Sequence, residues 1–162
     1  MTGQFRNQSW GRRFAELGDK AEGVFEKVTT EPFIRSGLNR PDFTNKLLGQ
    51  LPSRERHRPD YLTPTGYVEV KGFGREQTAR LKVDEIDCLK WWQTLFPVSV
   101  FFYDSHKKEH ATVPLDEIAQ AINDGRALLD HYPEGKAYFA IHKGDLGGVW
   151  HKVPAGALVT PT

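Results

Sequence analysis

The stretch that decides the fold is RPDYLTPTGYVEVKG, residues 58–72, in which two short apolar segments flank a turn. Side chains alternate between the two faces of a strand, so Glu69 and Lys71 share one face while the valines beside them point into a core. The Thr-Pro-Thr-Gly turn at 63–66 predicts a hairpin that folds Asp60 back against Glu69. Two carboxylates and an ammonium would then converge on one spot, which suits a hard divalent cation and an activated water.

The composition is ordinary for a soluble globular protein. A chain of 162 residues predicts one domain over 1–153, followed by a loose, Pro/Gly-containing tail over 154–162. The single cysteine, Cys88, excludes an internal disulfide framework and a Cys-based zinc site. The longest apolar run is too short to span a bilayer, and residues 1–7 lack the apolar core of a signal peptide. We therefore expect a cytoplasmic, or otherwise intracellular, protein with no membrane partner.

The net charge of +1 hides an asymmetry between the two halves of the chain. Residues 1–82 carry fifteen Lys/Arg against ten Asp/Glu, a net of +5, whereas residues 83–162 carry seven against eleven, a net of −4. The positive excess lies in the half that contains the carboxylate segment. It favours a polyanion such as nucleic acid as the partner, the alternative being a solvated surface of mixed charge.

Apolar spacing and breakers predict an alternation of helices and strands. Helices are expected at 19–27, 83–96 and 114–122, and strands at 58–62, 66–72, 98–103, 111–113 and 137–141. Asp19 is the expected N-cap of the first helix, with Glu22 in capping-box position, and Pro114 is the expected first residue of the last helix. Residues 29–56 are irregular, with room for an edge piece at 32–35 and a short helix around 42–48.

Pro59-Asp60 followed by Glu69-Val70-Lys71 resembles the signature of the PD-(D/E)XK nuclease superfamily, and the resemblance extends over roughly residues 15–115. It implies a restriction-endonuclease-like α/β fold, a central mixed β-sheet flanked by helices with an αβββαβ core. Similar members are small phage and bacterial deoxyribonucleases, Holliday-junction resolvases and restriction-type endonucleases. The family usually has an extra strand between the first helix and the Pro-Asp strand, for which this chain offers only 32–35.

The resemblance implies a nuclease that needs Mg²⁺ or Mn²⁺ and cuts DNA, with branched or structured DNA as one candidate substrate. Asp60 and Glu69 would hold the metal, with the backbone carbonyl of Val70 as a third ligand. Lys71 should stay protonated beside two carboxylates, and would orient the water or stabilise the phosphorus centre. Glu22 would help to bind the metal. Its capping role is an equal alternative, and Glu26, one turn later, competes for the same task.

Polar residues around the motif are the predicted nucleic-acid contacts, namely Arg56, Arg58, Arg75, Gln77, Arg80 and Lys82. A nucleic-acid-binding protein that does not cut, and a member that cuts RNA, remain open as alternatives. A binding module needs basic residues but has no use for a carboxylate pair that repels phosphate, which favours the nuclease. A homodimer is also open, since a resolvase-like enzyme needs two-fold symmetry to cut two strands. The histidines of 104–110 have a metal-ligand spacing, but the adjacent Lys107 and Lys108 favour a solvated turn.

Overall fold

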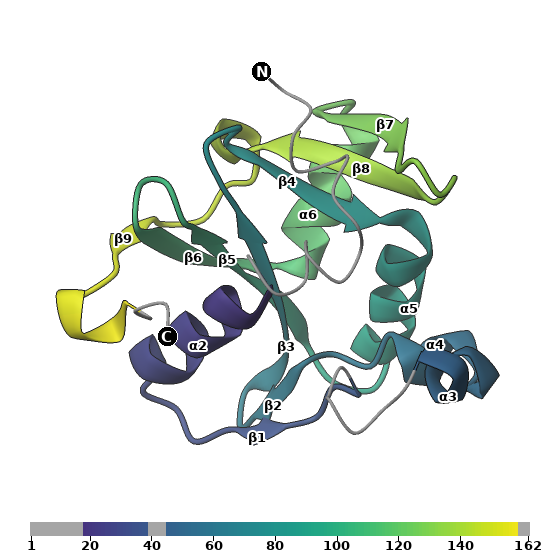
Figure 1. Cartoon of the computed structure of the whole chain (residues 1–162), viewed down its shortest axis with the longest axis horizontal. Helices are drawn as coiled ribbons and strands as arrows, with labels where there is room; N and C mark the ends of the chain where they lie inside the picture. Colours follow the sequence, from purple (N-terminus) through teal and green to yellow (C-terminus); the bar gives the residue numbers. More distant parts are fainter. Residues whose placement is uncertain (1–17, 39–44, 159–162) are drawn as a thin grey trace.

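A computed structural model describes residues 18–38 and 45–158 of the chain (Figure 1). A six-stranded sheet runs through it in the order β1-β2-β3-β5-β6-β9. Strands β3 and β5 are parallel and the other neighbouring pairs are antiparallel, so the sheet is mixed. Its strands are β1 Ile34–Arg35, β2 Tyr61–Thr63, β3 Gly66–Phe73, β5 Val98–Asp104, β6 Glu109–Pro114 and β9 His151–Lys152.

A second, three-stranded sheet has the order β4-β8-β7 and is antiparallel throughout. Its strands are β4 Thr78–Lys82, β8 Ala137–His142 and β7 Ala127–His131. Strand β4 follows β3 after a short turn but leaves the large sheet. Between the first described helix and β5 the chain therefore contributes β1, β2 and β3 to the large sheet, and β4 to the small one.

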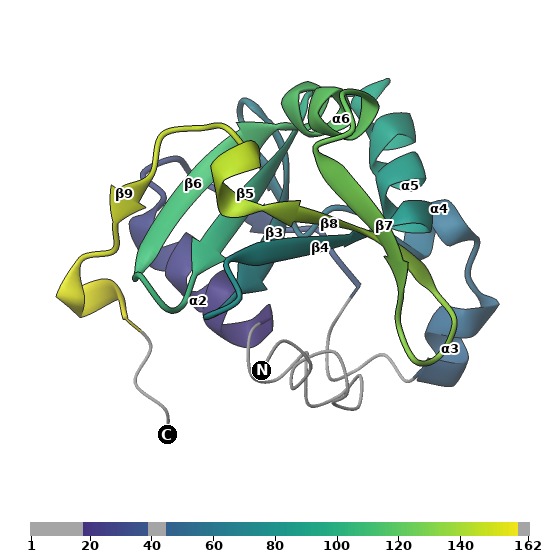
Figure 2. The same ribbon diagram turned by 90° about the horizontal axis from the view of Figure 1, so that it is seen from above.

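Helices lie on both faces of the large sheet (Figure 2). They are α2 Asp19–Val28, α3 Asn45–Gln50, α4 Ser53–Arg56, α5 Val83–Gln93 and α6 Leu115–Asn123, with 3-10 turns η2 Lys143–Asp145 and η3 Ala155–Ala157. Alternation along β5 supplies both layers of the core. Phe101 and Tyr103 pack with α2, whereas Val100 and Phe102 pack with α5, α6 and the small sheet.

The predicted hairpin is confirmed, with Tyr61 opposite Val68 and Thr63 opposite Gly66. The expected edge piece at 32–35 is strand β1, paired antiparallel to β2. Helix α5 ends at Gln93, three residues before the expected end. Strands β4, β7 and β9 were not predicted. Strand β4 alternates polar and apolar residues but is only five residues long, whereas β7 and β9 show no such alternation.

Three expectations about helix and chain ends need correction. Gly18, not Asp19, is the N-cap of α2, and it makes no side-chain cap bond, so the capping box is absent. Pro114 is the N-cap of α6 and not its first helical residue. The loose tail was expected from residue 154, but Ala157 is buried with α2, while residues 159–162 lie outside the described part. In the described ranges, no helix is long and apolar enough to cross a membrane.

Candidate functional site

Asp60 stands immediately before β2, with 5% of its surface exposed. The β2–β3 ladder reaches Tyr61 opposite Val68, and two residues further along β3 the Val70 N–H donates to the Asp60 carboxylate at 2.8 Å. The carboxylate thus continues the ladder where the backbone of β2 stops. The N–H and C=O of one strand residue point to the same edge, so the Val70 carbonyl is directed toward the edge that Asp60 occupies.

The chain before the motif holds Asp60 from the other side. The backbone N–H groups of Ser36 and Gly37 donate to the Asp60 carbonyl at 2.8 and 3.1 Å. A Cβ atom at Gly37 would lie 3.0 Å from the Asp60 Cα and 3.1 Å from its Oδ1. Glycine therefore permits a close approach that fixes both the backbone and the carboxylate of Asp60.

Glu69 and Lys71 share the face of β3 that is turned to α5, as predicted, while Val68 and Val70 pack on the α2 side. The Lys71 Nζ donates to Glu69 Oε1 at 2.5 Å and to Glu85 Oε1 at 2.7 Å. Sequence reasoning missed Glu85. It reads as an ordinary acid in the first turn of a helix, where the helix dipole favours negative charge, and only packing of α5 on β3 brings it to Lys71.

Carboxyl groups outnumber ammonium groups at this spot. Burial first, and then the charge of Asp60, raise the pKa of Glu69 well above its ordinary value. Burial by itself would lower the pKa of Lys71, but the carboxylates of Glu69, Glu85 and Asp60 outweigh it and raise that pKa well above its usual range. Burial would raise the pKa of Glu85, but Lys71 outweighs it and lowers that pKa. Three carboxylates thus surround one ammonium that stays protonated.

Glu22 and Glu26 of α2 lie on the opposite side of the hairpin, near Tyr61. The Tyr61 hydroxyl donates to Glu26 Oε1 at 2.7 Å, and Arg35 forms an ion pair with the same oxygen. Glu22 is half-buried one turn earlier. Burial, the bond to Glu26 and the charge of Glu22 together raise the pKa of Tyr61 far above its ordinary value. The metal role of Glu22 stays a prediction, and Glu26 is already held by Tyr61 and Arg35.

Two predicted nucleic-acid contacts lie near the motif on its α4 and α5 sides. Arg58 pairs with Glu55 at 2.5 Å and lies 5.5 Å from the ring centre of Trp92. Lys82 immediately precedes α5, and its pKa is lowered. Burial is the main cause and the positive charge of Lys71 adds to it, whereas the negative charge of Glu85 acts in the opposite direction. Lys82 is therefore in electrostatic reach of the carboxylate site.

The other predicted contacts are distributed more widely. Arg56 is half-buried on α4, and Arg75 is exposed in the turn between β3 and β4. Arg80 pairs with Glu76 at 3.1 Å. Gln77 belongs to a different cluster, since its Nε2 donates to the Gly74 carbonyl and, at 3.0 Å, to Asp104.

The expected solvated turn at 104–110 is wrong for Asp104. Its side chain is 0% exposed and pairs with Lys143 at 2.7 Å. The sequence around Asp104 does not predict this burial, because its partner Lys143 lies 39 residues further along the chain.

Among the described residues, no three His, Cys, Asp or Glu side chains are grouped so that they could hold a metal ion by themselves. Asp60 and Glu69 offer two carboxylates, and Val70 offers a carbonyl directed to the same edge. Mg²⁺ is commonly bound through one or two carboxylates and keeps several waters. The donor set therefore fits a hard divalent cation.

No family model matches the chain, and no curated protein sequence matches it. A similar solved structure is that of D212, a nuclease from a fusselovirus, at 8% sequence identity and a TM-score of 0.48. The match covers 78% of this chain and 76% of that one. At this level of similarity the comparison carries no argument about activity.

Proposed function

We propose that this protein is a metal-dependent deoxyribonuclease of the PD-(D/E)XK type, which uses Mg²⁺ or Mn²⁺ to hydrolyse phosphodiester bonds in DNA. Branched or structured DNA is a candidate substrate. The observation that carries the proposal is that two buried carboxylates, Asp60 and Glu69, and the half-buried carboxylate of Glu85 lie around the ammonium of Lys71. A site that only binds DNA has no use for three carboxylates, because they repel phosphate.

Asp60, Glu69 and the carbonyl of Val70 would hold the ion. When bound, the ion would supply a water of lowered pKa and offset charge on the phosphate. The Val70 N–H and the close contact with Gly37 hold the Asp60 carboxylate in one position, which suits it to bind the ion. Glu69 is suited to bind the same ion because its position on β3 brings its carboxyl group close to that of Asp60.

Lys71 would donate to a phosphate oxygen and stabilise the charge that develops on it. It is suited to this role because the surrounding carboxylates keep it protonated. Glu85 is the positioning residue. Its contact with the Nζ of Lys71 would persist when Glu69 turns toward a cation, so Lys71 would keep its place.

Cleavage assays test the proposal. Supercoiled plasmid, linear duplex, four-way junction and RNA substrates are incubated with Mg²⁺ or Mn²⁺, with EDTA as the metal-free control. Asp60→Asn, Glu69→Gln and Lys71→Ala should abolish cutting while circular dichroism shows a retained fold. Asp87→Asn is the matched control, since Asp87 is exposed on α5 and makes no contact with Lys71.

The outcomes separate the alternatives. Cutting by all three variants at the wild-type rate would show that the site is wrong. Binding of DNA without cutting of any substrate would favour the non-cleaving protein, and cutting of RNA alone would favour the RNA-cleaving member.

The positioning role of Glu85 has its own test. Glu85→Gln should lower kcat by about 10- to 100-fold with little change in KM, the usual effect of removing a group that orients a site residue. Glu85→Asp should recover part of the rate, and Asp87→Asn should retain all of it. A wild-type kcat in Glu85→Gln would rule out the role.

A further inference from the structure

Three segments that are distant in sequence meet at one end of the large sheet. They are the β3–β4 turn at 74–77, the β5–β6 turn at 105–108 and strand β9, and together we call them the tip. Ser105 donates to the Phe73 carbonyl through its N–H at 2.9 Å and its hydroxyl at 3.0 Å. Lys152 Nζ donates to the Lys107 carbonyl at 3.2 Å, which joins β9 to the β5–β6 turn.

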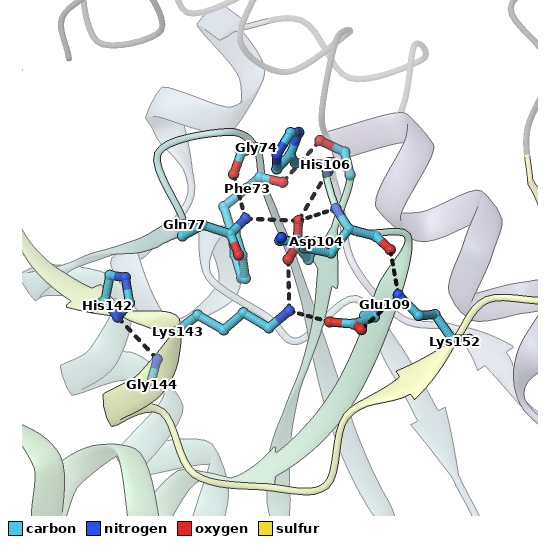
Figure 3. A network of polar contacts seen from close by, with 12 residues as sticks. Phe73, Gly74, Gln77, Asp104, His106, Glu109, His142, Lys143, Gly144 and Lys152 are labelled. Carbon is cyan, nitrogen blue, oxygen red and sulfur yellow. Dashed lines mark hydrogen bonds and ion pairs between the residues drawn. The ribbon is translucent and has the colours of Figure 1, made fainter. Parts of the chain in front are cut away.

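The acids beneath the tip are neutralised by basic side chains of the protein itself (Figure 3). Lys143 Nζ pairs with Asp104 at 2.7 Å and with Glu109 at 2.5 Å, and Glu109 also pairs with Lys152 at 2.9 Å. Two carboxylates and two ammonium groups cancel. The remaining acid of the tip, Glu76, is paired with Arg80, as described above.

Asp104 also holds the β5–β6 turn in one conformation. Its Oδ1 accepts the backbone N–H groups of His106 and Lys107, each at 2.9 Å, and the Nε2 of Gln77 at 3.0 Å (Figure 3). The bond from Gln77 links this turn to the β3–β4 turn. A buried carboxylate thus fixes the backbone that carries the exposed side chains of Lys107 and Lys108.

Three basic side chains of the tip have no internal counter-charge. Arg75, Lys107 and Lys108 are exposed, and within 18–38 and 45–158 no acidic side chain pairs with any of them. Lys107 and Lys108 belong to the acidic half of the sequence, and folding alone brings their turn to the turn that carries Arg75. The tip therefore presents a net charge of about three positive units to its surroundings, which suits a row of phosphates.

The tip lies within reach of a duplex bound at the candidate site. Arg75 follows Lys71 by four residues, so the Cα atoms of these two residues are at most about 13 Å apart even in extended backbone. That length corresponds to roughly four base pairs at 3.4 Å each.

We propose that the tip binds backbone phosphates of duplex DNA within a few base pairs of the bond that is cut. The inference rests on the proposed function for the identity of the nucleic acid. Lysine ammonium groups act as point charges on phosphates, so the tip adds affinity and orientation without reading sequence.

The salt dependence of binding tests the tip directly. Duplex affinity is measured by fluorescence anisotropy in EDTA, in an Asp60→Asn background that leaves the DNA uncut. Each phosphate contact contributes about 0.9 to the slope of log K against log salt. The double variant Lys107→Ala/Lys108→Ala should therefore flatten the slope by about 1.8, so its affinity should fall about 12-fold less than that of the background protein between 50 and 200 mM salt.

The matched control is Lys20→Ala/Lys27→Ala, which removes the same charge from exposed positions on α2, on the other face of the sheet. Its slope should stay unchanged. An unchanged slope in the tip variant, or an equal change in the control, would overturn the inference.

Cleavage by otherwise wild-type protein distinguishes failure of the tip from failure of the proposed activity. The tip variant should raise KM for long duplexes and leave kcat unaltered, because the tip is remote from the reacting phosphate. A flattened slope with no cutting of any DNA would refute the nuclease and support the tip. Cutting of DNA with an unchanged slope in the tip variant would support the nuclease and refute the tip.

Discussion

The raised pKa of Glu69 predicts that the metal-free protein loses stability as the pH rises above 4.5. Burial and the charge of Asp60 raise the pKa of Glu69 well above 4.5, its ordinary value. Folded Glu69 then keeps its proton in a pH range where the unfolded chain has lost it. Its contribution to stability is complete below pH 4.5 and is lost as the pH rises from 4.5 through the raised pKa.

A divalent cation should reverse this trend. An ion that binds only the folded state at 100 times its Kd adds about 2.7 kcal/mol to the free energy of unfolding. For a chain of this size, about 1 kcal/mol corresponds to a Tm shift of roughly 2–4 °C, so the expected increase is about 5–11 °C. The increase should grow with pH, because the ion requires Glu69 in its ionised form.

Thermal unfolding across a pH series, with and without Mg²⁺ or Mn²⁺, measures both effects. Glu69→Gln should flatten the fall in metal-free Tm and abolish the metal-induced rise, whereas Asp87→Asn should show both. An equal rise with metal in wild type and Glu69→Gln would refute the reasoning, because the ion would then bind elsewhere.

The remaining predictions concern the groups that support the two clusters. Asp104→Ala removes the buried partner of Lys143, so urea unfolding should show a free energy of unfolding lower by about 3 kcal/mol. A decrease of less than about 1 kcal/mol would contradict the importance of this buried pair. Burial by itself would raise the pKa of Asp104, but the bonds from Lys143 and other donors outweigh it and lower that pKa below 3.8. The stability that ionised Asp104 contributes is therefore complete above pH 3.8 and is lost on acidification, and Asp104→Ala should not show this acid-dependent loss of stability. Gly37→Ala should displace Asp60 and reduce cleavage, while Gly49→Ala, whose added Cβ meets nothing within 4 Å, should cut normally.

Local rules predicted the hairpin and much of the surrounding order of elements. A period of two along 66–72 places Glu69 and Lys71 on one face, and the turn at 63–66 returns Asp60 to them. Such rules need only neighbouring residues, because the geometry of strands and turns is set over a few peptide units. The same rules did not predict β7 and β9, whose short segments are stabilised by pairing with other strands rather than by patterns of their own, and they missed the five-residue alternation of β4.

Tertiary structure decided which charges meet. Glu85 reaches Lys71 because α5 packs on β3, and Lys143 reaches Asp104 because η2 lies beside the end of β5. Neither pairing has a signature in the chain, since acids at a helix start and lysines in a turn are common on any surface. The sequence by itself determined the chemistry of one hairpin. Long-range burial of apolar faces decided what surrounds that hairpin, because packing brings distant elements together and carries their charged side chains with them.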